Sequence, residues 1–144
     1  MKQRLCITGG SGYIGAMLAD QFVHREDVEA ILLIDKENET TLTKESPNRH
    51  KFTFIKDNLG NAETESDWMK QVRDFAPTTI IHTAWQIRDI YGNRPLQRKW
   101  NISGSDHVFD LAFTTPSCTR LVCFSTVASY GAFPTNRIEY RYKE

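Results

Sequence analysis

The sequence has few cysteines, no long hydrophobic run and no excess of charge of either sign. Its three cysteines, Cys6, Cys118 and Cys123, are an odd number without a Cys-x-x-Cys spacing, which argues against a disulfide framework and against a zinc site. We interpret them as small buried residues in or beside strands. The 18 basic and 18 acidic residues give a formal net charge of +0, so charge indicates neither a nucleic-acid partner nor an anionic membrane surface.

The size and composition are those of one ordinary globular domain. The chain has 144 residues, of which 40% are hydrophobic and 25% are charged. The apolar stretch in MKQRLCITGG at the N-terminus is too short for a signal peptide or a membrane span, so we expect a cytoplasmic protein. No second histidine or cysteine stands at metal-ligand spacing from His82, and we expect no metal.

Apolar runs alternate with helical patterns along the chain. Strands are predicted at 4–8, 30–35, 52–57, 78–85 and 120–126, and helices at 13–25, 65–75 and 95–112. In the first helix we expect Ile14, Met17, Leu18 and Phe22 to share one face, and we expect residues 36–51 to form an exposed loop. This alternation predicts an α/β fold with a doubly wound parallel sheet, the Rossmann arrangement, whose ligand lies beyond the carboxyl ends of the strands.

The stretch TGGSGYIG follows the first predicted strand and opens the first predicted helix. In a dinucleotide site Gly9 permits the tight turn, Gly12 lets a pyrophosphate approach the backbone, and Gly15 lets the helix pack closely on the sheet. The N–H groups and the helix dipole at Tyr13 and Ile14 then bind the phosphates. The alternative is a surface turn in which glycines gather for steric reasons alone.

An acidic residue, Asp35, closes the second predicted strand 20 positions after Gly15. A carboxylate there accepts hydrogen bonds from the ribose hydroxyls of adenosine and repels a 2′-phosphate, which favours NAD over NADP. Lys36 and Arg49 are cations that would soften this preference. The alternative is a solvated charge at the end of a strand.

These motifs and four others occur in the order found in one enzyme family. DNL at 57–59, HTAW at 82–85, NISGSDHVFDLA at 101–112 and STVASYG at 125–131 follow the glycine loop. The sequence thereby resembles the extended short-chain dehydrogenase/reductases, specifically the NAD-dependent epimerase/dehydratase family. The resemblance covers nearly the whole chain, although Thr83 and Trp85 depart from the commonest form of the HTAW segment.

The resemblance implies roles for individual residues. Asp57 and Asn58 would contact the adenine, the 82–85 segment would lie along the ribose and phosphates, and Asn101 would hold the geometry of the active site. Ser125 would lie close to the nicotinamide, and Thr126 would be the catalytic partner of the substrate hydroxyl. The residues expected to bind the cofactor are Gly9, Ser11, Gly12, Tyr13, Ile14, Gly15, Asp35, Lys36, Asp57, Asn58, Thr83, Ala84, Trp85, Asn101 and Ser125.

The chemistry of this family also needs a tyrosine followed four residues later by a lysine, so that a phenolate can accept the proton of a substrate hydroxyl. The 144 residues contain no such pair: Tyr140 is followed at that spacing by Glu144. We therefore expect residues 1–144 to be the N-terminal portion of an NAD-binding domain, C-terminally truncated, with the remaining strands, the Tyr-x-x-x-Lys helix and the substrate domain absent. Such a fragment would be inactive alone.

The leading hypothesis is the NAD-binding half of an epimerase or dehydratase that acts on a nucleotide sugar. The intact protein would be a homodimer with the 95–112 helix near the interface. The alternative is an NmrA-like Rossmann protein that senses NAD or NADP without catalysis. Structural roles are the preferred interpretation of four residues: His82 as a buried strand residue bonded to backbone, Trp68 and Trp100 as core or interface, and Tyr130 as packing. For Thr126 a strand-end hydroxyl is the alternative to the catalytic role.

Overall fold

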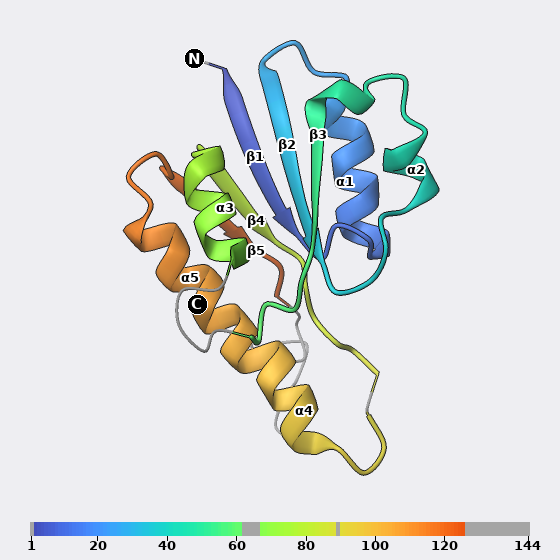
Figure 1. Cartoon of the computed structure of the whole chain (residues 1–144), viewed down its shortest axis with the longest axis vertical. Helices are drawn as coiled ribbons and strands as arrows, with labels where there is room; N and C mark the ends of the chain where they lie inside the picture. The colour runs from blue at the N-terminus through green and yellow to red at the C-terminus, as the bar shows by residue number, and fades with distance from the viewer. Residues whose placement is uncertain (1, 62–66, 89, 126–144) are drawn as a thin grey trace, which may run out of the picture.

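A computed structural model of the chain describes residues 2–61, 67–88 and 90–125. These residues form a parallel sheet with the strand order β3-β2-β1-β4-β5, shown in Figure 1. The strands are β1 (Gln3–Thr8), β2 (Val28–Asp35), β3 (Phe52–Lys56), β4 (Thr79–His82) and β5 (Arg120–Cys123). All neighbouring strands pair in parallel, so the predicted doubly wound α/β fold is confirmed.

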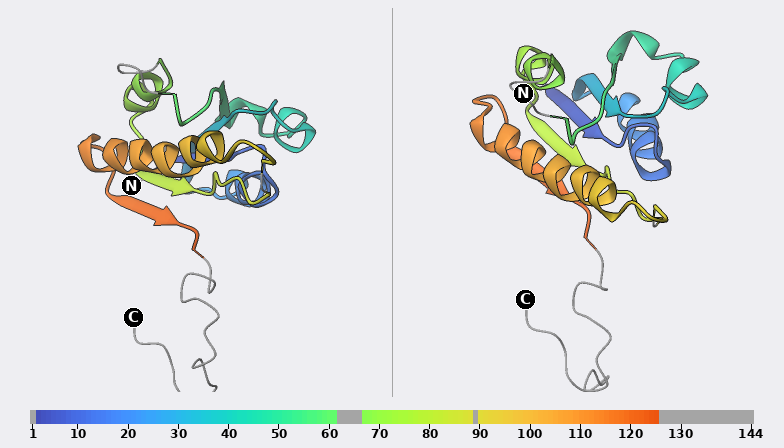
Figure 2. Two further views of the ribbon diagram at one scale, coloured as in Figure 1. Left: turned by 90° about the horizontal axis from the view of Figure 1, so that it is seen from below. Right: turned by 60° about the horizontal axis from the view of Figure 1, so that its bottom comes forward.

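Helices cover both faces of the sheet, as the two views of Figure 2 show. The helical elements are α1 (Tyr13–Val23), α2 (Thr41–Lys44), a 3₁₀ turn (Arg49–Lys51), α3 (Asp67–Phe75), α4 (Arg94–Arg98), a π-helical segment (Lys99–Ser103) and α5 (Gly104–Thr114). The strand order reverses at β1: β2 and β3 lie on one side of β1, and β4 and β5 lie on the other. This is the switch point at which ligands bind in open parallel sheets.

Two apolar clusters form the core, one on each face of the sheet. On one face Ala19 and Val23 of α1 pack against Ile7 and Leu33. On the other face α3 and α5 pack against the sheet, and Trp68 of α3 is fully buried. The three central strands, β1, β2 and β4, are buried on both faces along most of their length, as their continuous apolar runs predict for parallel strands, whereas the edge strand β5 is mostly exposed.

The structure corrects the predicted face of the first helix. Ile14 and Met17 are 44% and 45% exposed, whereas Gly15, Ala16, Ala19 and Val23 are buried. Leu18 and Phe22 pack only partly against the core. Small side chains let the axis of α1 approach the sheet closely, so the buried stripe follows the small residues rather than the largest apolar ones.

Two other predicted elements differ in detail. The segment 36–51, expected to be a loop, contains α2 and the 3₁₀ turn. The predicted 95–112 helix is divided into α4, the π-helical segment and α5. Among the described residues no helix is long and apolar enough to cross a membrane.

The three cysteines are free and lie in different environments. Cys6 on β1 is buried, and burial raises the pKa of its thiol to about 12. Cys118 is partly buried, but Cys123 is exposed, so the expectation of a buried residue is wrong for Cys123. The reason is its place on β5, where only Leu121 is partly covered.

Candidate functional site

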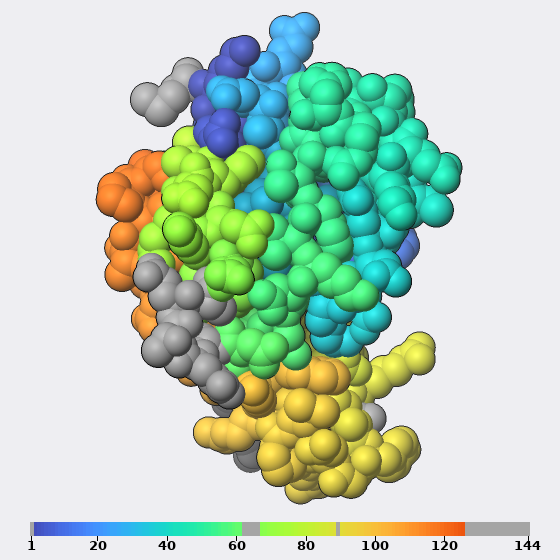
Figure 3. All heavy atoms as spheres, in the orientation of Figure 1, coloured from blue at the N-terminus to red at the C-terminus, as the bar shows by residue number. Residues whose placement is uncertain are grey.

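A hollow of about 240 Å³ opens at the carboxyl ends of the strands. Its walls come from the segments that follow β1, β2, β3 and β4 and from the π-helical segment. Figure 3 shows the cyan residues after β2 beside the yellow residues of the α4 segment at the lower end of the molecule. The fold thus brings together segments that are distant in the sequence.

Most of the residues expected to bind a cofactor line this hollow. They are Gly9, Ser11, Gly12, Asp35, Lys36, Asp57, Asn58, Thr83, Ala84, Trp85 and Asn101. Tyr13, Ile14 and Gly15 are on α1 and do not line it, and Ser125 is exposed beyond the end of β5. Thr126 and Tyr130 lie outside the described residues.

The glycine loop is shaped by two positions that have no room for a side chain. Gly9 has a φ of +73°, and a Cβ placed there would lie 2.8 Å from the backbone nitrogen of Ala84. A Cβ on Gly15 would overlap the carbonyl oxygen of Gly9. The loop therefore packs directly on the segment after β4 and on the start of α1, as only glycine permits.

Where the glycine loop meets the N-terminus of α1, backbone N–H groups lack a capping side chain and one hydroxyl lacks a partner. Gly12 is the N-cap and supplies no side-chain hydrogen bond, so the first N–H groups of the helix have no capping side chain. The hydroxyl oxygen of Ser11 is buried without a hydrogen-bond partner among the described residues. A buried unpaired hydroxyl is costly, and beside a helix N-terminus it suits an anionic ligand such as a phosphate.

Asp35 joins the glycine loop to the end of β2. Its Oδ2 accepts a hydrogen bond of 2.9 Å from the backbone N–H of Ser11, and its Oδ1 accepts one of 2.9 Å from the N–H of Glu37. The carboxylate is therefore a structural clamp as well as part of the wall. Two oxygens have about four acceptor positions, so acceptor capacity remains for ligand hydroxyls.

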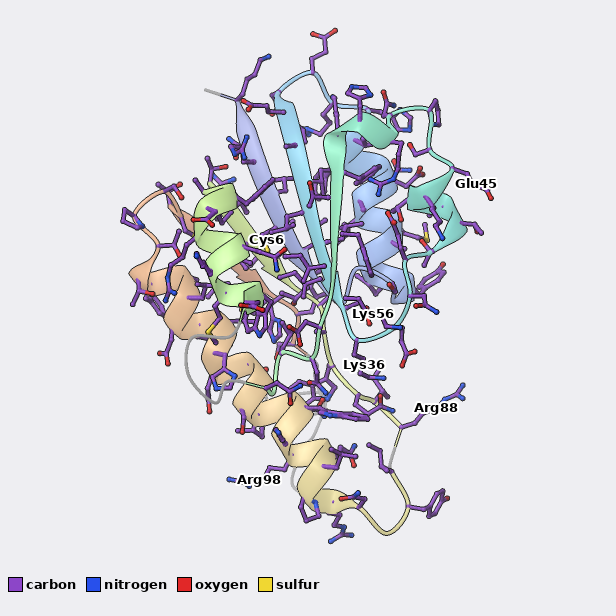
Figure 4. All side chains as sticks on the ribbon, viewed as in Figure 1. Cys6, Lys36, Glu45, Lys56, Arg88 and Arg98 are labelled. Atoms are coloured by element: carbon purple, nitrogen blue, oxygen red, sulfur yellow. The ribbon has the colours of Figure 1, made fainter. Side chains whose placement is uncertain are left out.

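Lys36 directly follows Asp35 at the end of β2 and also lines the hollow. Its ammonium donates to Glu37 Oε1 at 2.5 Å and lies 4.7 Å from the centre of the Trp100 ring. Figure 4 labels Lys36 between the lower end of the sheet and the α4 segment. The hydrogen bond from Lys36 lowers the pKa of the Glu37 carboxyl below its usual value.

Asp57 and Asn58 shape the turn after β3 through hydrogen bonds to backbone. Asp57 Oδ1 accepts from the N–H of Asn58 at 2.7 Å, and Asn58 Oδ1 accepts from the N–H of Gly60 at 3.0 Å. This turn packs tightly against the long helix, since a Cβ on Gly60 would lie 2.7 Å from the carbonyl oxygen of Lys99. The turn thereby places both side chains at the wall of the hollow.

Asn101 fixes the segment that follows β4. Its Oδ1 accepts from the N–H of Gln86 at 2.7 Å, and its Nδ2 donates to the carbonyl of Gln86 at 3.0 Å. Asn101 is buried within the π-helical segment, a feature that is rare and often found at functional sites. The paired hydrogen bonds hold Gln86, Trp85 and their neighbours along one side of the hollow.

Behind this wall His82 is the centre of a buried hydrogen-bond chain. Ser105 Oγ donates to the carbonyl of Asn101 at 2.6 Å, so it accepts from His82 Nε2–H at 2.9 Å. His82 Nδ1 then accepts from the hydroxyl of Thr8 at 2.6 Å. Burial lowers the pKa of His82 to about 4, which keeps the ring neutral and the chain of donors intact.

This geometry supports the structural interpretation of His82 but corrects its partners. The sequence suggested bonds to backbone, whereas the ring is bonded to the hydroxyls of Thr8 and Ser105. Ser105 lies one turn after Asn101 on the helix, and no local pattern pairs it with β4. Among the described residues no group of three or more His, Cys, Asp and Glu side chains is arranged to hold a metal ion.

Sequence reasoning missed several residues of the hollow. Ile34, Glu37, Leu59, Gln86 and Trp100 also line it. The interpretation of Trp100 as core or interface is wrong for the core, because Trp100 lines the hollow and belongs to neither apolar cluster. Its position immediately before Asn101 was the available signal, but a rare π-helical turn decides which way this part of the helix faces.

Comparisons with known proteins agree with this architecture. A model of the NAD dependent epimerase/dehydratase family matches residues 5–143. Comparison with the sequences of curated proteins finds no match.

Solved structures of several enzymes have the same fold. Bordetella bronchiseptica WbmH in complex with NAD+ aligns with a TM-score of 0.78 and 22% identity over 94% of this chain and 43% of that chain. Bacillus anthracis dTDP-glucose 4,6-dehydratase in complex with NAD aligns with a TM-score of 0.74 and 19% identity over 99% of this chain and 42% of that one.

A third similar structure is the UDP-Glc/GlcNAc 4-epimerase of Campylobacter jejuni, with a TM-score of 0.68 and 21% identity over 90% of this chain and 39% of that one. This chain thus spans about 40% of the length of the solved structures it resembles. The family match extends over almost all of the 144 residues. The chain therefore belongs to the NAD dependent epimerase/dehydratase family.

Proposed function

We propose that this chain binds NAD in the hollow at the switch point and is the cofactor-binding part of an enzyme that acts on a nucleotide sugar. One observation carries the proposal. The glycine loop, the acidic end of β2, the Asp57–Asn58 turn and Asn101 all line a single hollow. Any parallel sheet brings the carboxyl ends of its strands to one edge, but a surface turn gives no reason for the buried unpaired hydroxyl of Ser11 and the uncapped N-terminus of α1 at that edge.

The residues around the glycine loop fit a pyrophosphate. The uncapped N-terminus of α1 presents N–H groups and a positive dipole end. The unpaired buried hydroxyl of Ser11 supplies a further donor. Gly12 is exposed and leaves the backbone accessible to an anion.

The adenosine part would be held at the ends of β2 and β3. Asp35 would accept hydrogen bonds from the ribose hydroxyls with the acceptor positions that Ser11 and Glu37 leave open. Asp57 and Asn58 would lie at the adenine. Thr83, Ala84 and Trp85 would line the path of the ribose and phosphates, and Asn101 would position them through Gln86.

NAD, when bound, supplies the acceptor for a hydride from a substrate alcohol. By the resemblance to the family, Thr126 would hold the substrate hydroxyl and Ser125 would lie near the nicotinamide. None of the five tyrosines in the 144 residues is followed four positions later by lysine. We therefore propose that these residues bind the cofactor without turning over substrate on their own.

The substrate class and the assembly belong to the same proposal. Similar solved structures include a UDP-Glc/GlcNAc 4-epimerase, a dTDP-glucose 4,6-dehydratase and WbmG in complex with NAD and UDP, which supports a nucleotide sugar. A homodimer would use the surface of α5 and the π-helical segment, where Ile102 and Phe113 are exposed apolar residues. The expected compartment is the cytoplasm.

Titration calorimetry with NAD and NADP tests the cofactor proposal. We expect the chain to bind NAD at least tenfold more tightly than NADP, a difference of about 1.4 kcal/mol. Asp35→Asn removes the charge but keeps an oxygen that accepts one N–H, so it should retain NAD binding and lose most of the preference. Asp35→Ala also releases Ser11 and Glu37 and should weaken NAD binding.

Asp74→Ala, at an exposed position on α3, is the matched control and should bind both nucleotides as the unchanged chain does. The proposal is wrong if the folded chain, checked by circular dichroism, binds neither nucleotide. If Asp35→Asn keeps the preference for NAD over NADP, the role given to Asp35 is wrong, but the proposed cofactor site is not contradicted.

A further inference from the structure

We infer that Glu37 and Trp100 strengthen the preference for NAD by holding the ammonium of Lys36 away from the position that a 2′-phosphate of NADP would need. This inference rests on the proposed cofactor site. It concerns a contact between the end of β2 and the π-helical segment, two elements that are far apart in the sequence.

Lys36 is the single basic residue among those that line the hollow. It directly follows Asp35, the residue expected at the ribose. In dinucleotide sites a cation at this corner accommodates the 2′-phosphate, whereas an acidic residue binds the free 2′-hydroxyl. The sequence therefore holds opposing signals for the two cofactors at adjacent positions, and the structure shows how one of them is suppressed.

Two contacts engage the Lys36 ammonium. Glu37 accepts a hydrogen bond of 2.5 Å, and the face of Trp100 lies 4.7 Å away. At an exposed site one such contact raises the equilibrium constant for the engaged position of an ammonium by a factor of about two to five. A 2′-phosphate would have to compete with both contacts for this cation.

The charge around Lys36 acts in the same direction. The residues that line the hollow include three carboxylates, on Asp35, Glu37 and Asp57, beside the single ammonium. With Lys36 engaged by Glu37, the remaining field at this corner is negative. It disfavours the additional charge of NADP but not the neutral 2′-hydroxyl of NAD.

Two other cations on either end of β3 are also engaged with their own partners: Arg49 lies in the turn before the strand, and Lys56 ends the strand beside Asp35. Arg49 donates to the carbonyl of Phe52 at 2.6 Å and to Glu39 at 3.3 Å. Lys56 donates to Asn38 Oδ1 at 2.7 Å, and Figure 4 labels it at the same end of the sheet as Lys36. Neither Arg49 nor Lys56 lines the hollow, so Lys36 is the cation whose release would matter.

Binding constants for NAD and NADP, measured by calorimetry on variants of the whole chain, test this inference. Glu37→Gln removes the charge of one partner while keeping its shape, and Trp100→Leu removes the aromatic face. We expect each to raise the affinity for NADP relative to NAD by about threefold, and the double variant by about tenfold. Trp100→Phe keeps a ring and should change the ratio less than Trp100→Leu.

Lys36→Met separates this mechanism from a general change of the pocket. Added to the double variant, it should reverse the gain in NADP affinity, because the released ammonium is the group that binds the phosphate. Trp85→Leu is the matched control, since Trp85 lines the same hollow and should alter both affinities equally.

The possible outcomes are distinct. A shifted ratio that Lys36→Met reverses supports the inference. If the chain binds NAD and the ratio stays the same in every variant, the inference fails while the proposed function stands. If the folded chain binds neither nucleotide, the proposed function fails and the inference fails with it.

Discussion

The two walls of the hollow are built in different ways. The wall after β1 and β2 is made largely of backbone: Gly9 and Gly15 allow close approach, and Asp35 binds two N–H groups. The wall after β4 is made of side chains, with Asn101 bound to Gln86 and His82 behind it. One wall depends on the absence of a Cβ, and the other depends on particular polar groups.

This difference teaches where each wall is vulnerable. Backbone that is packed against backbone has no side chain that can move aside, so an added methyl group forces the main chain to shift. A hydrogen-bonded side-chain network instead fails when one donor or acceptor is removed or when a group changes its protonation state. An added methyl group should therefore destabilise the first wall, whereas loss of a polar group or a change of pH should destabilise the second.

The largest effect is expected from Gly15→Ala. The new Cβ would overlap the carbonyl oxygen of Gly9, so the free energy of unfolding should fall by more than about 3 kcal/mol. Gly92→Ala is the control: Gly92, unlike Gly15, has a positive φ, +75°, but nothing lies within 4 Å of the added Cβ, so only backbone strain is introduced. It should cost about 1 kcal/mol in chemical denaturation, and equal losses in the two variants would contradict the steric argument.

The next effect is a pH dependence from His82. The pKa of His82 is about 4 in the folded chain, below the ordinary value of 6.5, because the ring is buried. As the pH falls from 6.5 to 4, the unfolded chain takes up a proton that the folded chain does not. The free energy of unfolding should therefore decrease through this window, by up to about 3 kcal/mol, and level off below it.

Denaturation curves of the unchanged chain and of His82→Asn between these pH values measure how much of the decrease in the free energy of unfolding is due to His82. Asparagine keeps a donor and an acceptor but does not titrate, so its curve should lack this decrease. Identical slopes in the two proteins would show that His82 is not the group responsible.

A smaller effect is expected from Asn101→Ala. It leaves the N–H of Gln86 without its partner and leaves the carbonyl of Gln86 with only the longer bond of 3.3 Å from Gln97 Nε2, which should lower the free energy of unfolding by about 2 kcal/mol. Asn93→Ala is a matched control, since Asn93 is exposed and its side chain accepts only the N–H of Leu96 as the N-cap of α4. The free energy of unfolding of Asn93→Ala should fall by about 1 kcal/mol. A larger fall in Asn93→Ala than in Asn101→Ala would contradict this prediction.

Much of the fold could be predicted because its signals are local. The five strands and α3 lie close to their predicted ranges, since continuous apolar runs and helical spacing mark each of them. The glycine loop, Asp35, Asp57 and Asn58 were placed together because parallel strands direct their carboxyl ends to one edge. Thr126, the expected catalytic residue, lies outside the described residues and stays a prediction.

Other features could not be read from local patterns. Ile14 and Met17 follow a helical period but are exposed, because close packing of α1 selects Gly15 and its small neighbours. The π-helical segment turns Trp100 into the wall of the hollow, where Lys36 meets it. The partners of His82 lie 74 and 23 positions away, so no window of sequence contains them.

The sequence by itself determined the parallel sheet and the glycine-lined edge, because strand propensity and the steric freedom of glycine act within a few residues. The tertiary structure alone decided which distant side chains meet at that edge. The bonds of Asn101 to Gln86, of His82 to Ser105 and the contact of Lys36 with Trp100 exist only because α5 and its π-helical start pack across the ends of the strands. Their physical basis is packing, which depends on the whole chain at once.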